Sequence, residues 1–118
     1  MARILVVDDS EPVREICGRM LSRLGHEVVT AADAAEALTV YGVARPDAVL
    51  LDVGLPDRSG LDVLVDLRDA NPDVRVAMLT AERERAVVLR ALELGVRDYL
   101  VKPFALERLR EAMLRLFA

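Results

Sequence analysis

The chain has 118 residues, with 20 acidic and 16 basic side chains, a formal net charge of −4 and a hydrophobic fraction of 53%. This length suits one domain with its own apolar core, the acidic balance offers no general attraction to nucleic acid, and no apolar run approaches the ~20 residues that cross a bilayer. The opening segment MARILVVDD reaches acidic residues too soon for a secretory signal, so we expect a cytoplasmic location. Together these features predict a domain that binds neither nucleic acid nor membrane directly.

Five short runs rich in β-branched and aliphatic residues alternate with segments of helical periodicity, and this alternation is the main signal for the fold. The predicted strands are RILVV (3–7), EVVTA (27–31), AVLLD (48–52), VRVAML (74–79) and DYLV (98–101). The first, third and fourth runs are apolar along their length, which predicts burial on both faces of the sheet.

Helix start and stop signals fill the intervals between the strands. The first predicted helix opens at Pro12 and stops at Gly25, and the second begins at the capping residue Asp33. The remaining helices are expected at about 60–70, 82–94 and 105–117. Helices of this length between consecutive strands require parallel pairing with right-handed crossovers. The predicted fold class is therefore α/β, a doubly wound five-stranded parallel sheet with five helices on its two faces.

Two single residues are assigned structural rather than chemical roles. The lone Cys17 lies on the apolar side of the first predicted helix, which favours a buried, reduced thiol. His26, the only histidine, follows Gly25 at a helix-to-strand turn and is expected to be an ordinary surface residue.

In a doubly wound sheet, ligands bind beyond the carboxyl ends of the strands. At those ends stand the pair Asp8 and Asp9, then Asp52, Thr80 and Lys102. Each alone has an ordinary structural explanation, but four successive strand ends carrying such groups indicate one site. Two adjacent carboxylates repel each other unless water, a cation or a basic side chain offsets their charge, so a cation is expected there.

With these residues in view, the sequence closely resembles a response-regulator receiver domain, the phosphoacceptor module of two-component signalling. The likeness covers nearly the whole chain, residues 1–118, and rests on the segments VVDDS, LLDVGLPDRSG, MLTA and DYLVKPF. It implies the flavodoxin-like strand order 2-1-3-4-5. It also implies transfer of a phosphoryl group to Asp52 from a partner histidine kinase or phosphotransfer protein, and output to a downstream effector protein or domain.

The resemblance further implies the role of each site residue. Asp9, Asp52 and the backbone carbonyl of Gly54 would hold Mg²⁺, with Asp8 reaching the ion through water. Lys102, Thr80 and the ion would neutralise charge on the phosphoryl oxygens, and Pro103 would follow a cis peptide bond. Tyr99 resembles the family's switch aromatic, which moves with Thr80 and alters the surface around the fourth helix, fifth strand and fifth helix. The residue types support the Mg²⁺ site independently of the resemblance, because hard oxygen ligands without imidazole or thiolate suit this ion.

Some positions depart from the commonest pattern of that family. Gly54 supplies no side chain to screen an acyl phosphate, and Glu82, two residues after Thr80, is acidic; both positions bear on phosphate lifetime. Arg97 stands where receivers that dimerise through the fourth helix, fifth strand and fifth helix usually carry aspartate. This substitution does not favour that mode of dimerisation.

Three other functions are compatible with an α/β fold of this kind. A flavodoxin-like electron carrier needs a hydroxyl-rich and Gly-rich loop for the flavin phosphate, where this chain has two aspartates. A Rossmann or P-loop enzyme needs its glycine-rich motif after the first strand, and neither motif occurs. A receiver-fold binding module that works without phosphorylation remains as the alternative.

Overall fold

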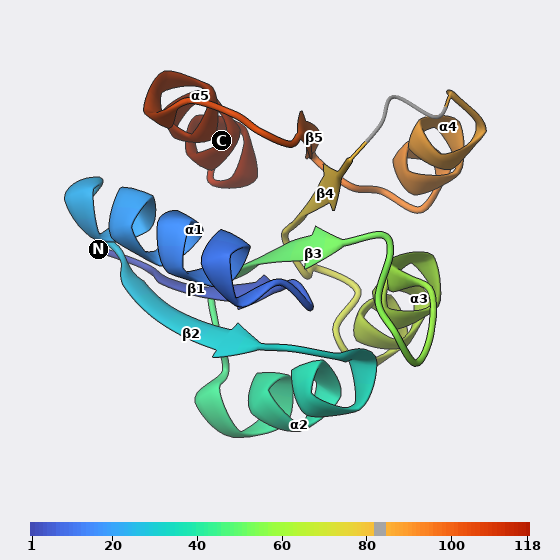
Figure 1. Ribbon diagram of the computed structural model, residues 1–118. Coiled ribbons are helices and arrows are strands. Elements are labelled where there is room, and N and C mark those ends of the chain that lie inside the picture. The colour runs from blue at the N-terminus through green and yellow to red at the C-terminus, as the bar shows by residue number, and fades with distance from the viewer. Residues whose placement is uncertain (82–84) are drawn as a thin grey trace.

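The computed structural model describes residues 1–81 and 85–118, which form a single parallel sheet covered by helices on both faces (Figure 1). The strands are β1 (Arg3–Val7), β2 (Glu27–Ala31), β3 (Ala48–Asp52), β4 (Val76–Thr80) and β5 (Asp98–Val101). The helices are α1 (Glu11–Arg23), α2 (Ala34–Ala44), α3 (Gly60–Ala70), α4 (Arg85–Glu93) and α5 (Leu106–Leu116). The strand order is β2-β1-β3-β4-β5 with every pairing parallel, which confirms the predicted fold class.

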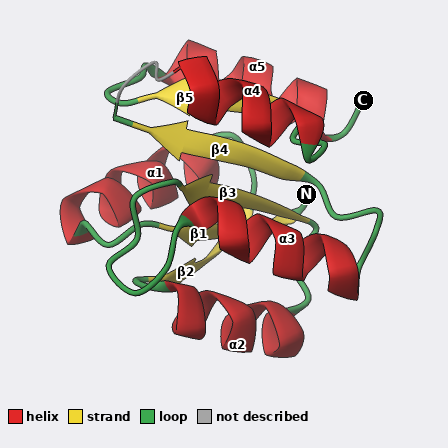
Figure 2. Ribbon diagram, turned by 90° about the vertical axis from the view of Figure 1, so that its right-hand side faces the viewer, coloured by secondary structure: helices red, strands yellow, loops and turns green. Residues whose placement is uncertain are grey.

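Two apolar layers lie on opposite sides of the sheet. Figure 2 shows α2, α3 and α4 on one face, with α1 and α5 on the other. Successive residues of a strand point to opposite faces, so Leu5 and Val7 join the core under α2 and α3, whereas Ile4 and Val6 join the core under α1 and α5. All five residues of β3 and all five of β4 are buried, as their continuous apolar character predicts.

The described element boundaries match the prediction to within two residues, and the differences at α1 and β4 have clear structural causes. α1 begins at Glu11, one residue before Pro12, because Ser10 serves as its N-cap and accepts a hydrogen bond from the backbone N–H of Val13. β4 begins at Val76 rather than at 74, because the N–H of Val74 is bonded to the carbonyl of Asn71 in a turn. The strand also extends to Thr80, which places that hydroxyl on the last residue of β4.

The predicted helix signals at Gly25 and Asp33 have clear structural counterparts, and Gly95 follows α4 as Gly25 follows α1. Gly25 and Gly95 follow α1 and α4 with φ values of 89° and 86°, in the left-handed region that favours glycine. The Asp33 carboxylate accepts a 2.8 Å hydrogen bond from the N–H of Glu36 and caps α2. Glu82 and the predicted start of the fourth helix at 82–84 lie outside the described residues.

Cys17 is buried, with 1% of its surface exposed, in the core beneath α1 and α5. Burial, together with the negative charge of Asp8 nearby, raises the pKa of its thiol to about 11. The thiol is therefore protonated at neutral pH, as expected of a core residue.

Candidate functional site

The predicted site residues meet at the carboxyl end of the sheet. Asp8 directly follows β1, Asp52 ends β3, Thr80 ends β4 and Lys102 directly follows β5. A surface hollow of about 380 Å³ lies over these strand ends; its lining consists of Asp9, Asp52, Val53, Gly54, Thr80, Ala81, Val87 and Lys102. The parallel topology thus gathers residues from four separate sequence segments into one hollow.

Three carboxylates at this edge of the sheet are close enough to share one cation. One oxygen each from Asp8, Asp9 and Asp52 lie within 4.8 Å of one another. Asp8 is fully buried and Asp52 is 5% exposed, whereas Asp9 is exposed to solvent. Carboxylate oxygens beside a hollow that is open to solvent fit Mg²⁺, which prefers hard oxygen ligands and keeps some of its water.

Lys102 places a positive charge beside two of these three carboxylates. Its ammonium donates hydrogen bonds to Asp8 Oδ2 at 2.9 Å and to Asp52 Oδ1 at 3.3 Å. Burial opposes the charge, but the hydrogen bonds and attraction of the two carboxylates outweigh it and raise the pKa of Lys102 above 10.5. The peptide bond between Lys102 and Pro103 is cis, as the resemblance to receiver domains implies.

A single ammonium does not neutralise the two carboxylates that it contacts. Burial and the nearby charge of Asp8 raise the pKa of Asp52 above its ordinary value, although Lys102 and the N–H of Gly54 act in the opposite direction. The pKa of Lys102 is raised because two carboxylates attract it, whereas for Asp52 burial and the charge of Asp8 together outweigh the attraction of the single ammonium. The site therefore keeps a negative charge that a cation can offset.

This residual charge predicts that Asp52→Asn stabilises the domain in the absence of divalent ions. A folded-state pKa above the unfolded one means that ionised Asp52 costs stability at neutral pH, and the neutral amide removes this cost. We expect the free energy of unfolding in chelator to rise by about 0.5–1.5 kcal/mol. Urea unfolding at pH 7 measures this, with Asp73→Asn in the exposed turn after α3 as control. A lower free energy of unfolding for Asp52→Asn than for the wild type would show that the charge of Asp52 does not destabilise the folded domain.

Asp8 is held by contacts on both sides of its backbone. Its N–H bonds to the carbonyl of Ala31 on the neighbouring strand, and its own carbonyl accepts a 2.7 Å hydrogen bond from the Arg14 guanidinium. Its second carboxylate oxygen, Oδ1, accepts from the N–H of Ser10 at 2.9 Å. Sequence reasoning missed Arg14, whose position in the second turn of α1 carries no chemical signal by itself.

Thr80 and Tyr99, the predicted switch pair, occupy adjacent strands but different hollows. Thr80 is 7% exposed, lines the carboxylate hollow and accepts through its carbonyl a 2.8 Å hydrogen bond from the N–H of Lys102. Tyr99 is half-buried and lines a second hollow of about 420 Å³ together with Val101 and the neighbouring Arg108. The paired strands β4 and β5 connect the two residues.

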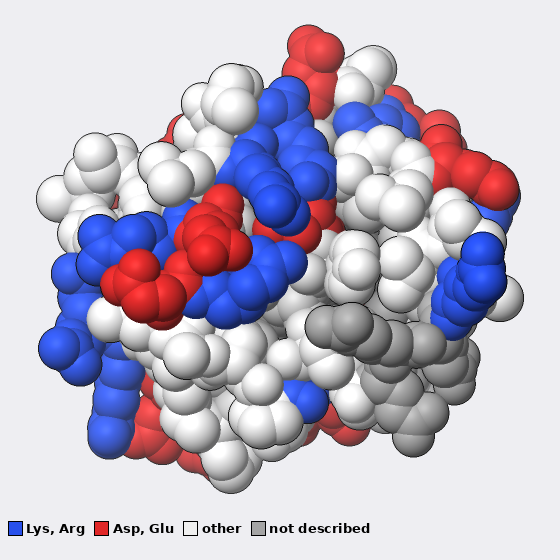
Figure 3. All heavy atoms as spheres, turned by 90° about the horizontal axis from the view of Figure 1, so that it is seen from above, with Lys and Arg blue, Asp and Glu red and all other residues white. Residues whose placement is uncertain are grey.

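Asp98, next to Tyr99, is a buried carboxylate that the sequence analysis did not single out. It is 3% exposed and accepts two hydrogen bonds from Arg108, at 2.9 and 2.8 Å, and one from Arg115 at 3.0 Å. Figure 3 shows the face of α4, β5 and α5, where basic side chains gather over α5 with acidic ones among them and uncharged surface lies toward α4. Arg97 on this face donates to the carbonyls of Leu116 and Ala118.

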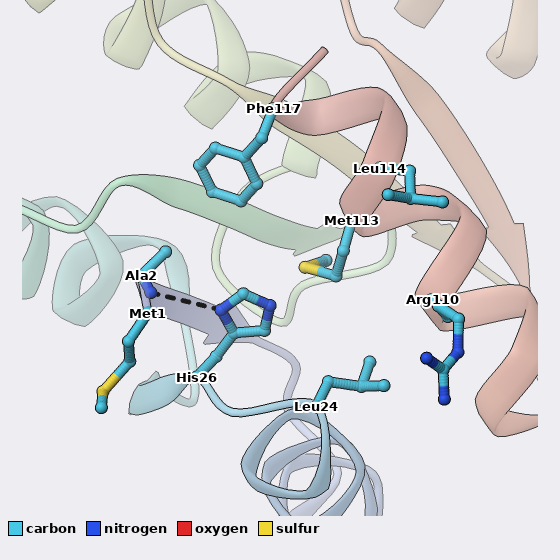
Figure 4. Close-up of a pocket in the computed structure, with 8 residues that line it drawn as sticks. All are labelled: Met1, Ala2, Leu24, His26, Arg110, Met113, Leu114 and Phe117. Carbon is cyan, nitrogen blue, oxygen red and sulfur yellow. Dashed lines mark hydrogen bonds between the residues drawn. The ribbon is translucent and has the colours of Figure 1, made fainter.

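A larger hollow, about 490 Å³, lies at the opposite end of the strands (Figure 4). It is mostly apolar, and its polar members His26 and Arg110 lie apart from the carboxylates. His26, expected as a plain surface residue, accepts a hydrogen bond from the N–H of Ala2 and stacks on Phe117 at 6.3 Å between ring centroids. Volume alone therefore does not locate the chemically reactive groups of this domain.

Comparisons with known proteins agree with this geometry. The model of the response regulator receiver domain family matches residues 4–114. The chain is 46% identical over 113 residues to the probable transcriptional regulator ycf27 of Cyanophora paradoxa, covering 96% of this chain and 46% of that protein. It is also 46% identical over 111 residues to the response regulator MprA of Mycobacterium sp. (strain KMS), covering 94% of this chain and 48% of that protein. The chain thus spans about half the length of these relatives.

Solved structures give the same result. The chemotaxis protein CheY4 of Vibrio cholerae superimposes with a TM-score of 0.92 at 34% identity, covering 98% of both chains. The response regulator TrrA of Thermotoga maritima, solved in complex with Mg²⁺-BeF, has a TM-score of 0.89 at 34% identity, covering 98% of this chain and 99% of that one. Within 1–81 and 85–118, no helix has the length and apolar character that a bilayer span requires. The chain belongs to the response regulator receiver domain family, the phosphoacceptor domains of two-component systems.

Proposed function

We propose that residues 1–118 act as one cytoplasmic receiver domain in which Asp52 accepts a phosphoryl group in a Mg²⁺-dependent reaction. The donor is a phosphohistidine on a partner histidine kinase or phosphotransfer protein. The observation that carries the proposal is the pair of buried carboxylates, Asp8 and Asp52, that share Lys102 beside the exposed Asp9. The TrrA complex with Mg²⁺-BeF, at 34% identity, supports it.

In this reaction an Asp52 carboxylate oxygen attacks phosphorus. The new O–P bond forms as the P–N bond of the phosphohistidine breaks, and the imidazole nitrogen keeps the electron pair. Both partners are anionic, so charge neutralisation is the main requirement. Lys102, already 3.3 Å from Asp52, would bond a phosphoryl oxygen, and the Thr80 hydroxyl would donate to another.

Asp9, Asp52 and the carbonyl of Gly54 would hold Mg²⁺, and Asp8 would reach it through water. When bound, the ion would offset the charge that spreads over the phosphoryl oxygens. Asp8 is fully buried and bonded to Lys102, which supports an indirect role, whereas Asp9 is exposed beside the hollow.

Removing Asp9 should therefore weaken Mg²⁺ binding strongly. We expect Asp9→Ala to raise the Kd for Mg²⁺ by about tenfold or more, because one direct oxygen ligand and one negative charge are lost. Calorimetric or spectroscopic titration provides the measurement. Asp73→Ala is the matched control, since Asp73 is an exposed aspartate in the turn before β4. An unchanged Kd in Asp9→Ala would remove Asp9 from the ligand set.

We propose that phosphorylation reaches the face of α4, β5 and α5 through Thr80 and Tyr99, and that a downstream effector protein or domain reads this face. A hydrogen bond from Thr80 to the phosphoryl group would draw Thr80 toward Asp52 and open space for the Tyr99 ring. A partner would then bind one arrangement of Tyr99 better than the other.

Ring-proton spectra of the protein with and without Mg²⁺ and beryllium fluoride test this switch. The sequence holds two tyrosines, and Tyr41 at the end of α2 serves as the internal reference. We expect the Tyr99 resonances to shift while those of Tyr41 stay in place. Unchanged Tyr99 resonances in a saturated complex would mean that the signal leaves the site by another route.

A further inference from the structure

The carboxylate of Asp57, in the loop between β3 and α3, is bonded to a helix 22 to 23 residues away in sequence. Its Oδ1 accepts from the N–H of Ala34 at 2.9 Å, and its Oδ2 accepts from the N–H of Ala35 at 3.1 Å. These are first-turn amides of α2, which have no partner within the helix. Asp33 bonds the next amide, that of Glu36, at 2.8 Å. Two carboxylates therefore accept hydrogen bonds from three amides of this helix end. One carboxylate belongs to the N-cap residue Asp33, and the other belongs to Asp57 in a distant loop.

The loop that carries Asp57 also carries the proposed Gly54 ligand. Its base is closely fixed: the N–H of Gly60 bonds the carbonyl of Val53 at 2.8 Å, and Gly54 and Ser59 form an isolated antiparallel bridge. An added Cβ on Gly60 would overlap the carbonyl oxygen of Asp52, so the two ends of the loop touch. Asp57 and the proposed ligand Gly54 therefore belong to one short loop whose two ends are in contact.

Asp57 and its neighbour Arg58 connect this tip to other elements. Arg58 forms an ion pair with Asp66 at 2.7 Å, but both side chains are about 40% exposed and such surface pairs contribute little. The Asp57 bonds differ because an anion meets two N–H donors at the positive end of a helix dipole. These hydrogen bonds hold the pKa of Asp57 below its ordinary value.

The N-terminus of α2, to which Asp57 is bonded, is also connected to the loop after β1, which carries Asp8 and Asp9. α2 follows β2, whose last residue, Ala31, accepts a 3.1 Å hydrogen bond from the N–H of Asp8. A continuous path therefore runs from Gly54 through Asp57 to α2, and from Ala31 to Asp8 and Asp9. The loop after β3 and the loop after β1 are therefore linked through α2 and β2.

We propose that Asp57 is a positioning residue. Its two hydrogen bonds to the N-terminus of α2, which we call the clasp, hold the loop after β3 against this helix and so set the spacing between the two halves of the Mg²⁺ site. This inference rests on the proposed function, because it takes Asp9, Asp52 and Gly54 as the ligands. Asp57 would not touch the ion itself; it acts through the loop.

Titration of Mg²⁺ against matched cap variants tests the proposal. Asp57→Ala removes the clasp, Asp33→Ala removes a cap from the same helix end without freeing the loop, and Asp57→Asn keeps one acceptor oxygen. At raised ionic strength, where the loss of an exposed charge is screened, we expect Asp57→Ala to raise the Kd for Mg²⁺ roughly tenfold. Asp33→Ala should match the wild type, and Asp57→Asn should fall between the two.

Thermal unfolding in chelator, recorded on the same variants, separates positioning from simple stabilisation. Both alanine variants lose a helix cap and should unfold at lower temperature, so a purely structural role predicts equal Kd values for them. A wild-type Kd in Asp57→Ala, or the same rise in both variants, would overturn the inference alone. Absence of Mg²⁺ binding by the wild type would overturn the cation site and the inference with it.

Discussion

Replacing Lys102 with methionine is expected to slow phosphoryl transfer to Asp52 by about 100-fold while tightening the binding of Mg²⁺. The transfer slows because the ammonium that would stabilise the phosphoryl oxygens is lost. Mg²⁺ binds more tightly because Lys102 no longer competes for Asp8 and Asp52, which it now contacts at 2.9 and 3.3 Å. Opposite changes in these two quantities distinguish a catalytic role from general damage to the site.

The same variant should be less stable only when Mg²⁺ is absent. Methionine leaves the fully buried Asp8 without its cation, and we expect the free energy of unfolding in chelator to fall by about 2 kcal/mol. Saturating Mg²⁺ should restore most of this loss. Lys102→Arg, which keeps the charge, is the control for stability. A transfer rate within about twofold of wild type in Lys102→Met would remove Lys102 from the mechanism.

Asp98→Asn should produce the largest loss of stability outside the proposed phosphoacceptor site, about 2–3 kcal/mol at pH 7. The carboxylate is buried and accepts hydrogen bonds from Arg108, Arg115 and the N–H of Tyr99. An amide offers one acceptor oxygen and turns two N–H groups toward the guanidinium groups. Glu111→Gln is the control, since Glu111 reaches Arg108 only at 3.9 Å from an exposed position and should cost under about 0.5 kcal/mol.

The effect of Asp98 should also depend on pH in a defined direction. Burial alone would raise the pKa of Asp98, but the hydrogen bonds from Arg108 and Tyr99 and the charge of Arg115 lower it below 3.8. A depressed folded-state pKa contributes stability above the unfolded value of 3.8 and loses it as the pH falls through the folded value. Urea unfolding should therefore show a wide gap between wild type and Asp98→Asn at pH 7 that narrows below about pH 4. A gap independent of pH would contradict this account.

The fold could be predicted from sequence because its signals are local. β3 and β4 are continuous apolar runs, Gly25 marks a helix end through its backbone freedom, and Asp33 marks one through its side-chain cap. The start of β4 was misplaced because the turn that holds Val74 depends on a hydrogen bond to Asn71, which apolar periodicity does not show.

The candidate site was predictable to the extent that strand ends in a parallel sheet share one edge. Asp8, Asp52, Thr80 and Lys102 were located by this rule alone. This rule does not find Asp57 and Asp98, because their roles depend on partners in other elements, Ala34 of α2 for Asp57 and Arg108 of α5 for Asp98. An aspartate after proline is typical of an ordinary turn, and an aspartate at the first position of a strand is typical of a strand boundary. Only the folded structure shows the hydrogen-bond partner of each.

Intact mass after exposure to acetyl phosphate tests the phosphoacceptor assignment most directly. In this reaction the Asp52 oxygen forms a bond to phosphorus and acetate leaves, so no partner protein is needed. With Mg²⁺ present, the wild type should gain the mass of one phosphoryl group, whereas the wild type in chelator and Asp52→Asn with Mg²⁺ should gain none. No mass gain in the Mg²⁺-loaded wild type, or an equal gain in Asp52→Asn, would contradict the assignment of Asp52 as the phosphoacceptor.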